Sequence, residues 1–345
     1  MIKTAVVILN WNGIGWLQKF LETVIRYTAN QDTRVYVADN GSTDGSVKWI
    51  SDNFKDIRLI ILETNFGFAG GYNRSLNQID AKYYVLLNSD IEVTEGWLNP
   101  LVRYMDQNQG TASCQPKIKS FQNRNHFEYG GAAGGYIDKF GYTFCRGRIF
   151  DFIEKDYGQY DNTADIFWSS GACMIVRSDA WKKCGGLDDD FFAHMEEIDM
   201  CWRFHLAGFR VACVPESVVY HVGGGALHYD SSFKTYLNFR NNLFLLYKNL
   251  PDNKLHTILF VRKLLDGLAA LTFLFKGKPG SVKAIWKAHV DYYKSIKRLK
   301  EKRKSVMDLS IDNTFGKLMN KSVVFRFYIK GEKTFSSFNI QNFEK

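Results

Sequence analysis

Four short stretches within the first 90 residues are almost continuously apolar, and polar loops separate them. These stretches are 3–9, 34–38, 58–62 and 83–87. Runs of this length without polar alternation are typical of strands that are covered on both faces. Between them, residues 16–27 carry apolar side chains at helical spacing, and residues 47–53 form a second expected helix. Alternation of this kind predicts right-handed crossovers and a parallel sheet, so the fold class is α/β.

The polar loops after these strands are expected along one edge of the sheet, where ligands bind in open α/β folds. Asn10 and Asn12 follow the first strand and offer amide groups that can pair with the edge of a base. Asp39 follows the second strand and can accept from a base imide or from ribose hydroxyls. An Asx turn that caps a helix accounts for Asp39 equally well.

A glycine-rich run, 65–73, follows the third strand and has three glycines within five positions. Such a run lets the backbone approach a ligand closely, and the helix start after it suits a phosphate. It matches neither a Walker loop nor the dinucleotide fingerprint. The fourth strand ends in Asn88-Ser89-Asp90, whose two outer side chains could hold a hard divalent cation against a diphosphate. A simple turn at the end of a strand is the alternative interpretation.

Polar residues in the second half of the chain form three further candidate groups. Glu196, Glu197 and Asp199 fall in the first turn of an expected helix, where the helix dipole alone favours acids. His221 follows an apolar run and precedes three glycines, a place where a histidine is usually structural. Arg240 belongs to a polar patch on another expected helix, and it suits either an anionic ligand or capping.

Four segments together carry a family resemblance. They read VVILNWNG at 6–13, ADNGSTDGS at 38–46, NFGFAGG at 65–71 and LLNSD at 86–90. In this order they resemble inverting family-two glycosyltransferases of the GT-A fold, and especially the rhamnosyltransferase-like members that build bacterial surface polysaccharides. The resemblance implies a Rossmann-like, mostly parallel central sheet flanked by helices, with a C-terminal helical extension.

The resemblance also implies roles for particular residues. The family's usual Asp-x-Asp motif has Asn88 in place of its first acid here, while Asp90 keeps the position that ligates a cation. His221 occupies the place of a family histidine at the cation and diphosphate site, and such a ligand set suits Mg²⁺ or Mn²⁺. The family pattern Glu-Asp-x-Asp-Leu-Cys-x-Arg aligns with 196–203, which assigns the general base to Glu197 and keeps Asp199 as the second candidate.

Two larger sets of residues complete the expected site. The expected nucleotide-binding residues are Asn10, Asn12, Asp39, Asn65, Gly67, Asn73 and Asn88. The residues expected near the acceptor or the phosphates are Glu196, Trp168 and Arg240.

Charge is unevenly distributed along the 345 residues. The chain has a net charge of +9, and residues 276–304 hold eleven Lys or Arg against two acids, which equals the whole excess. A nucleic-acid partner is therefore not expected. Residues 255–275 are apolar but contain Arg262, Lys263 and Asp266, which argues against a spanning helix. Amphipathic helices on an anionic membrane surface, or a solvated basic helical pair, fit these residues.

The six cysteines show no regular spacing and are expected to be reduced, and no signal peptide is recognisable. We therefore expect a cytoplasmic protein associated with the inner face of the bacterial plasma membrane. The expected organisation is a GT-A domain at 1–250, a basic amphipathic helical extension at 251–305 and a tail of uncertain structure at 306–345.

The expected reaction moves a sugar from a nucleotide-diphosphate donor, dTDP-rhamnose or a UDP-hexose, to a hydroxyl of a saccharide acceptor that is lipid-linked. Two alternatives from other classes are a non-catalytic nucleotide-sugar-binding or membrane scaffold protein and a sugar nucleotidyltransferase. The second normally has a basic, glycine-rich phosphate loop near residue 10, which this sequence lacks.

Overall fold

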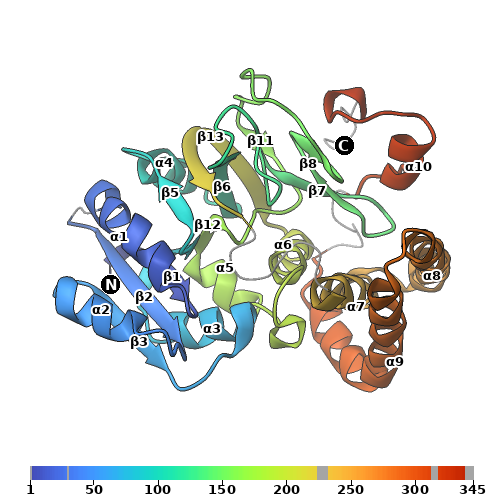
Figure 1. Ribbon diagram of the computed structural model, residues 1–345, viewed down its shortest axis with the longest axis horizontal. Coiled ribbons are helices and arrows are strands. Elements are labelled where there is room, and N and C mark those ends of the chain that lie inside the picture. The colour runs from blue at the N-terminus through green and yellow to red at the C-terminus, as the bar shows by residue number, and fades with distance from the viewer. Residues whose placement is uncertain (1, 29–30, 224–231, 312–317, 339–345) are drawn as a thin grey trace.

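A nine-stranded sheet forms the centre of the computed structural model, which describes residues 2–28, 31–223, 232–311 and 318–338 (Figure 1). The strand order is β11-β13-β6-β12-β4-β1-β2-β3, and β5 is added through its pairing with β13. The strands are β1 (Ile2–Asn10), β2 (Thr33–Asn40), β3 (Arg58–Leu62), β4 (Ala81–Asn88), β5 (Ile91–Val93), β6 (Thr111–Ser120), β11 (Ala164–Asp165), β12 (Cys173–Arg177) and β13 (Arg210–His221).

The main sheet has four parallel and four antiparallel strand pairs, and the parallel pairs join most of the paired residues, which confirms the expected mostly parallel α/β fold class. β1 runs parallel to β2 and β4, β2 to β3, and β6 to β13. β12 lies antiparallel between β4 and β6, while β5 and β11 run antiparallel to β13. The register places Asn10 opposite Asp39 and Leu9 opposite Asn88. The carboxyl ends of β1, β2 and β4 therefore meet at one edge, as the alternating pattern predicted.

Both faces of the sheet are buried at β1 and β4, which explains why these strands lack polar alternation. Ala5 and Val7 of β1 belong to one buried apolar cluster, and Val6 and Ile8 belong to a second. Helices cover both clusters. These helices are α1 (Ile14–Thr28), α2 (Ser46–Asn53), α3 (Gly67–Leu76), α4 (Leu98–Gln107), α5 (Ser178–Lys183) and α6 (Glu196–Leu206).

Residues 111–165 contribute one long strand to the main sheet and form a second, smaller sheet. The ten-residue strand β6 is a central member of the main sheet, although six of its ten side chains are polar. Its Lys117 is 5% exposed and pairs with Asp156 at 3.2 Å. The rest of the region forms a small antiparallel sheet of β7 (Gly135–Ile137), β8 (Thr143–Cys145), β9 (Arg148–Ile149) and β10 (Phe152–Ile153).

Three long helices lie together beside the sheet at one end of the molecule (Figure 1). They are α7 (Ser232–Asn249), α8 (Asp252–Phe275) and α9 (Pro279–Asp308). The chain then returns to the small sheet, where α10 (Val323–Tyr328) begins with a 2.9 Å hydrogen bond from the Val323 N–H to the buried Asp138 carboxylate. Part of the expected tail is thus ordered, and the division of the chain into domains stays a prediction. Within the described ranges, no helix is long and apolar enough to cross a bilayer.

Candidate active site

Side chains from the loops after β1 and β2 hold each other at the carboxyl edge of the main sheet. Asn10 Nδ2 donates to Asp39 Oδ1 at 3.0 Å and to Ser46 Oγ at 2.9 Å. Asn10 and Asp39 are at most 1% exposed. Asn12 Oδ1 accepts a hydrogen bond of 2.7 Å from the Thr43 N–H. These contacts order the two loops, and a contact of Asn10, Asn12 or Asp39 with a nucleotide stays a prediction.

The glycine-rich loop after β3 is fixed by Asn40 and Asn65. Asn40 Nδ2 donates to Asn65 Oδ1 at 3.1 Å and to the Gly67 carbonyl at 3.0 Å, and Asn65 Oδ1 also accepts from the Gly67 N–H. Gly67 has a φ of 72°, and a Cβ there would lie 2.5 Å from the Phe192 ring. Only glycine adopts this φ without strain and has no Cβ to clash with the ring. The glycine at position 67 therefore lets the backbone lie against Phe192.

Asp90, His221 and Glu128 form a buried row behind the same edge. His221 Nε2 lies 3.2 Å from Asp90 Oδ1, and His221 Nδ1 lies 3.3 Å from Glu128 Oε1. The three residues are at most 9% exposed. Strand β4 ends at Asn88, and Asp90 lies two residues later. His221 is the last residue of β13. The structure thus brings the two expected metal ligands into contact and adds Glu128, which the sequence did not indicate.

The charges of this row support one another. Burial lowers the pKa of His221, but the carboxylates of Asp90 and Glu128 outweigh burial and raise that pKa to about 10. Burial raises the pKa of Asp90, but the facing imidazolium outweighs it and holds that pKa below its usual range. In the absence of a bound cation, the His221 proton therefore supplies the positive charge beside Asp90.

The donor set of this row fits a divalent cation. Two ligands at right angles around an octahedral Mg²⁺ or Mn²⁺, each at about 2.1 Å, would lie about 3.0 Å apart. The Asp90–His221 separation of 3.2 Å is close to that value. Glu128 contacts the other ring nitrogen, as carboxylates that orient metal-binding histidines do. Among the described residues, no three His, Cys, Asp or Glu side chains could hold a metal ion by themselves. Phosphate oxygens and water would therefore complete the coordination sphere.

The acids at the start of α6 differ in environment. Burial raises the pKa of Glu197 to about 7, although backbone groups including those of Gly171 and Ile198 act against it. Burial and the neighbouring Glu197 charge raise the pKa of Glu196 well above its usual value. Asp199 is fully buried, and its carboxylate accepts from Arg203 at 2.9 Å, Lys248 at 3.0 Å and Asn249 at 2.9 Å. These partners neutralise Asp199, so the geometry favours Glu197 as a base.

The segment before β12 links Glu197 to the Asp90 row. A Cβ on Gly171 would lie 3.8 Å from Glu197 Cβ, and the Asn88 N–H donates to the Ala172 carbonyl at 2.9 Å. Ser170 Oγ donates to the Gly130 carbonyl at 2.7 Å, two residues beyond Glu128. Residues 170–172 therefore lie against Glu197 and bond to chain neighbours of Asp90 and Glu128, which come from distant parts of the sequence.

The loop that leads into α6 is strained and tightly held. Phe192, His194 and Met195 have φ values of 62°, 68° and 74°, a left-handed conformation that non-glycine residues rarely adopt. Asn241 of α7 donates to the carbonyls of Phe191, Ala193 and His194. This strain lies directly before Glu197, and the contacts from α7 hold it in place.

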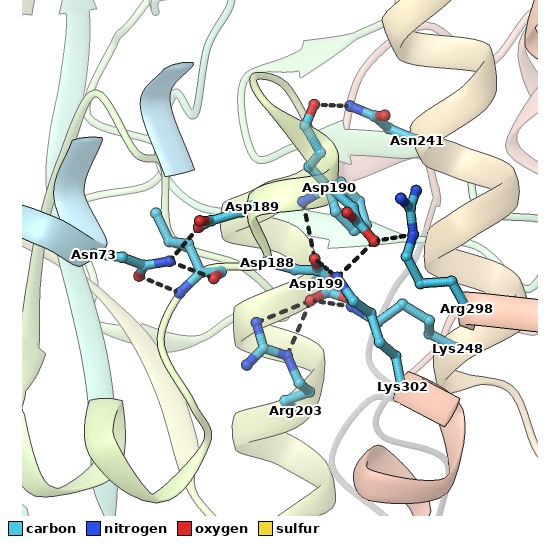
Figure 2. A network of polar contacts seen from close by, with 12 residues as sticks. Asn73, Asp188, Asp189, Asp190, Asp199, Arg203, Asn241, Lys248, Arg298 and Lys302 are labelled. Carbon is cyan, nitrogen blue, oxygen red and sulfur yellow. Dashed lines mark hydrogen bonds and ion pairs between the residues drawn. The ribbon is translucent and has the colours of Figure 1, made fainter. Parts of the chain in front are cut away.

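Three consecutive aspartates at the start of this loop connect it to helices on either side (Figure 2). Asp188 pairs with Lys248 of α7 and Lys302 of α9, and Asp190 pairs with Arg298 and Lys302 of α9. On the opposite side, Asp189 accepts from Asn73 of α3 at 2.6 Å. The C-terminal helices and α3 thus hold the loop jointly.

Several expected ligand contacts are occupied by protein partners. Asn73 donates to the Leu187 carbonyl at 2.7 Å and accepts from the Leu187 N–H at 3.0 Å, so its amide holds the loop. Arg240 donates to the carbonyls of Asp190 and Phe191. Trp168 is 4% exposed and donates to the Tyr136 carbonyl at 2.9 Å. These hydrogen bonds show a structural role for Asn73, Arg240 and Trp168. A direct contact of these residues with a ligand stays a prediction.

Lys302→Met is expected to destabilise the protein, because it removes one of two cations that neutralise the buried Asp188 and one that pairs with Asp190. A loss of about 1–3 kcal/mol is typical when a buried polar group loses a partner. Thermal unfolding measures the effect, and the exposed Lys304→Met on the same helix is the matched control. Equal unfolding midpoints for the two variants would show that the α9 contacts do not stabilise the fold.

Sequence reasoning missed Glu128, Asp188 and the cations that meet Asp188. Glu128 lies among short strands without periodicity, and Asp188 lies 60 residues from Lys248 and 114 from Lys302. Pairs at such separations leave no trace in the local pattern of a single sequence. The one available signal was the run of three aspartates beside two phenylalanines.

The chain is similar in sequence to several glycosyltransferases. Residues 5–185, slightly more than half of the chain, match glycosyl transferase family 2. An N-acetylglucosaminyl-diphospho-decaprenol L-rhamnosyltransferase of Mycobacterium tuberculosis is 25% identical over 233 residues, which are 59% of this chain and 71% of that protein. The rhamnosyltransferase WbbL of Escherichia coli is 27% identical over 175 residues, which are 49% of this chain and 64% of that protein.

Solved structures with a similar fold share little sequence with the chain. Staphylococcus aureus TarS 1–349 in complex with UDP-GlcNAc superposes with a TM-score of 0.55 at 15% identity, covering 89% of this chain and 91% of that one. GalNAc-T7 with UDP, GalNAc and Mn²⁺ gives a TM-score of 0.58 at 16% identity, covering 74% of this chain and 49% of that one. These likenesses concern the fold alone. Together with the sequence match, they show that the chain belongs to glycosyl transferase family 2 and is a glycosyltransferase of the GT-A fold.

Proposed function

We propose that the protein is an inverting, metal-dependent enzyme that transfers a sugar from a nucleotide-diphosphate donor to a saccharide hydroxyl in bacterial surface polysaccharide synthesis. The observation that carries this proposal is that residues 170–172 lie against Glu197 and accept a hydrogen bond from Asn88, two residues before Asp90, whose carboxylate contacts His221. The pair suits a cation at the donor diphosphate, and Glu197 suits the acceptor.

The choice of substrates follows from the relatives. Two of them are named rhamnosyltransferases, which supports dTDP-rhamnose as the first donor to test, and the UDP complexes of the fold neighbours support a UDP-hexose as the second. The name of the mycobacterial relative includes a diphospho-decaprenol acceptor, which supports a lipid-linked saccharide. An acceptor of this kind is met at the inner face of the plasma membrane, where we place the protein.

Each residue of the site has its own role in the proposed reaction. Glu197 takes the proton of the acceptor hydroxyl as the oxygen bonds to the anomeric carbon and the bond from that carbon to the donor diphosphate breaks. Burial and the Glu197 charge raise the pKa of Glu196 well above its usual value, which favours the neutral form of Glu196 beside an ionised Glu197. Asp90 and His221 would hold the divalent ion, whose charge offsets that of the departing diphosphate.

Glu128→Gln is expected to weaken Mn²⁺ binding by about 10- to 100-fold, the usual effect of losing a carboxylate that orients a histidine ligand. The reason is the contact between Glu128 and His221 Nδ1, which fixes the ring that faces Asp90. Titration of Mn²⁺ followed by electron paramagnetic resonance, in the presence of UDP, measures the affinity. The exposed Glu95→Gln is the control, and equal affinities in the two variants would contradict the role of Glu128.

The test of the proposed function is release of nucleoside diphosphate from a panel of nucleotide-sugars with Mn²⁺, with and without polyprenyl-diphosphate saccharides. Acceptor-dependent release with one donor is the expected result. Binding of a donor without turnover under all conditions would favour a nucleotide-sugar-binding scaffold protein. Formation of a nucleotide-sugar from nucleoside triphosphate and sugar phosphate would favour a nucleotidyltransferase.

A further inference from the structure

Helix α8 exposes a continuous apolar stripe that no part of the described chain covers. Its exposed residues are 51–87% accessible, far more than apolar side chains of a packed helix. They are Phe260, Leu264, Leu268, Leu271, Leu274 and Phe275. At about 100° per residue these positions fall within an arc of about 120°, which is one face of the helix.

The opposite face of α8 accounts for its packing. Leu255, Ile258 and Leu259 are buried, and Arg262 pairs with Asp266 at 2.7 Å, also in the interior. The N-terminal half of the helix is therefore anchored by one face, while the outer face is apolar from Phe260 to Phe275. The stripe spans about 24 Å at 1.5 Å per residue, so it is an extended surface and not one isolated exposed side chain.

Cations and amphipathic aromatic side chains surround the stripe. Lys263 at its edge donates to the Tyr293 hydroxyl of α9 at 2.8 Å. Trp286 of α9 is 70% exposed and lies seven residues before Tyr293, hence on the same side of that helix. Lys276 and Lys278 are exposed at the turn where the stripe ends. Segment 276–304 also holds the entire net charge of the chain, +9.

We infer that the α8 stripe is inserted in the headgroup region of an anionic lipid bilayer, with α8 lying along the surface. An apolar face flanked by lysine, tryptophan and tyrosine is the pattern of interfacial helices. The excess of cations attracts anionic lipids, whereas a second copy of the chain would bring an equal positive charge against it. The inferred membrane contact does not depend on the proposed function. Only its connection with a lipid-linked acceptor rests on that function.

The position of α8 relates this surface to the candidate site. α8 packs beside α7 and α9 at one end of the molecule (Figure 1), and α9 holds Asp188 and Asp190 before Glu197. A bilayer under α8 would therefore lie next to the helices that hold the loop leading into α6. An acceptor anchored in that bilayer would need to extend only its saccharide toward the main sheet.

Sedimentation of the full chain with vesicles tests the inference. We expect binding to phosphatidylglycerol vesicles that is at least about tenfold tighter than to phosphatidylcholine vesicles, as for basic interfacial helices. The triple variant Leu264→Gln, Leu268→Gln, Leu271→Gln should bind phosphatidylglycerol at least about tenfold more weakly, because three inserted side chains become polar. Ile61→Gln, which changes an apolar residue 62% exposed on β3, is the control and should bind like wild type.

Three results would overturn the inference. The first is no sedimentation of the wild-type chain with phosphatidylglycerol vesicles, and the second is unchanged binding by a triple variant whose circular dichroism matches wild type. The third is a wild-type oligomer in light scattering that the triple variant loses while lipid binding persists, since the stripe would then join two copies. The assay uses neither donor nor acceptor, so intact vesicle binding without sugar transfer would remove only the proposed function.

Discussion

Glu197→Gln is expected to reduce kcat for sugar transfer by about 10²–10⁴-fold, the usual contribution of a general base. The amide has nearly the same shape as the carboxylate but cannot take the acceptor proton. Donor binding should stay close to wild type, because the expected donor ligands lie at the ends of β1, β2 and β4. Steady-state transfer kinetics and titration of the nucleoside diphosphate separate the two effects, with the exposed Glu22→Gln as control.

The pH profile provides a second measurement of the same residue. Burial raises the pKa of Glu197 to about 7, so its carboxyl is increasingly protonated as the pH falls below that value. A base must be ionised, so the wild-type rate should fall about tenfold for each pH unit below about 7 and level off above it. The residual rate of Glu197→Gln should lack this step. Full activity in that variant would transfer the role of base to Asp199.

Local patterns in the sequence were sufficient to predict the strands of the first 90 residues. Strand β4 contains the expected run 83–87, because side chains covered on both faces are apolar at every position. Strand β3 also occupies 58–62 as expected, although it lies at the edge of the sheet and Ile61 is exposed. Strand β6 escaped the same reasoning. Its polar side chains are buried through specific partners, such as the Asp156 that pairs with Lys117, and periodicity does not reveal such partners.

The candidate site was predictable where motifs end strands and less so elsewhere. The family resemblance predicted Asp90 and His221 at one site. The two side chains lie 3.2 Å apart, and their binding of a cation stays a prediction. The sequence could not separate Glu197 from Asp199, because both lie in the first turn of α6. What separates them is Lys248, 49 residues further along the chain, which pairs with Asp199 and, in the described structure, not with Glu197.

The second large effect is expected at Asp90, where Asp90→Ala should abolish transfer. The variant removes the only carboxylate that faces His221 Nε2 among the described contacts, and with it one of the two expected protein ligands of the cation. His221 keeps its contact with Glu128, so the ring stays oriented. Loss of a residue that orients a metal ligand weakens metal binding by about 10- to 100-fold. Loss of a direct ligand such as Asp90 should weaken Mn²⁺ binding by at least as much.

Mn²⁺ titration and transfer kinetics on the same preparation test the assignment of Asp90. The control is Glu92→Gln, which removes a charge two residues away on β5, where Glu92 pairs with Arg124 at the surface. The control should keep both metal affinity and turnover, because Glu92 does not contact His221 in the described structure. Undiminished turnover in Asp90→Ala would contradict the metal assignment. Lost turnover with unchanged Mn²⁺ affinity would also contradict it, since Asp90 would then act by ordering His221 and not by binding the cation.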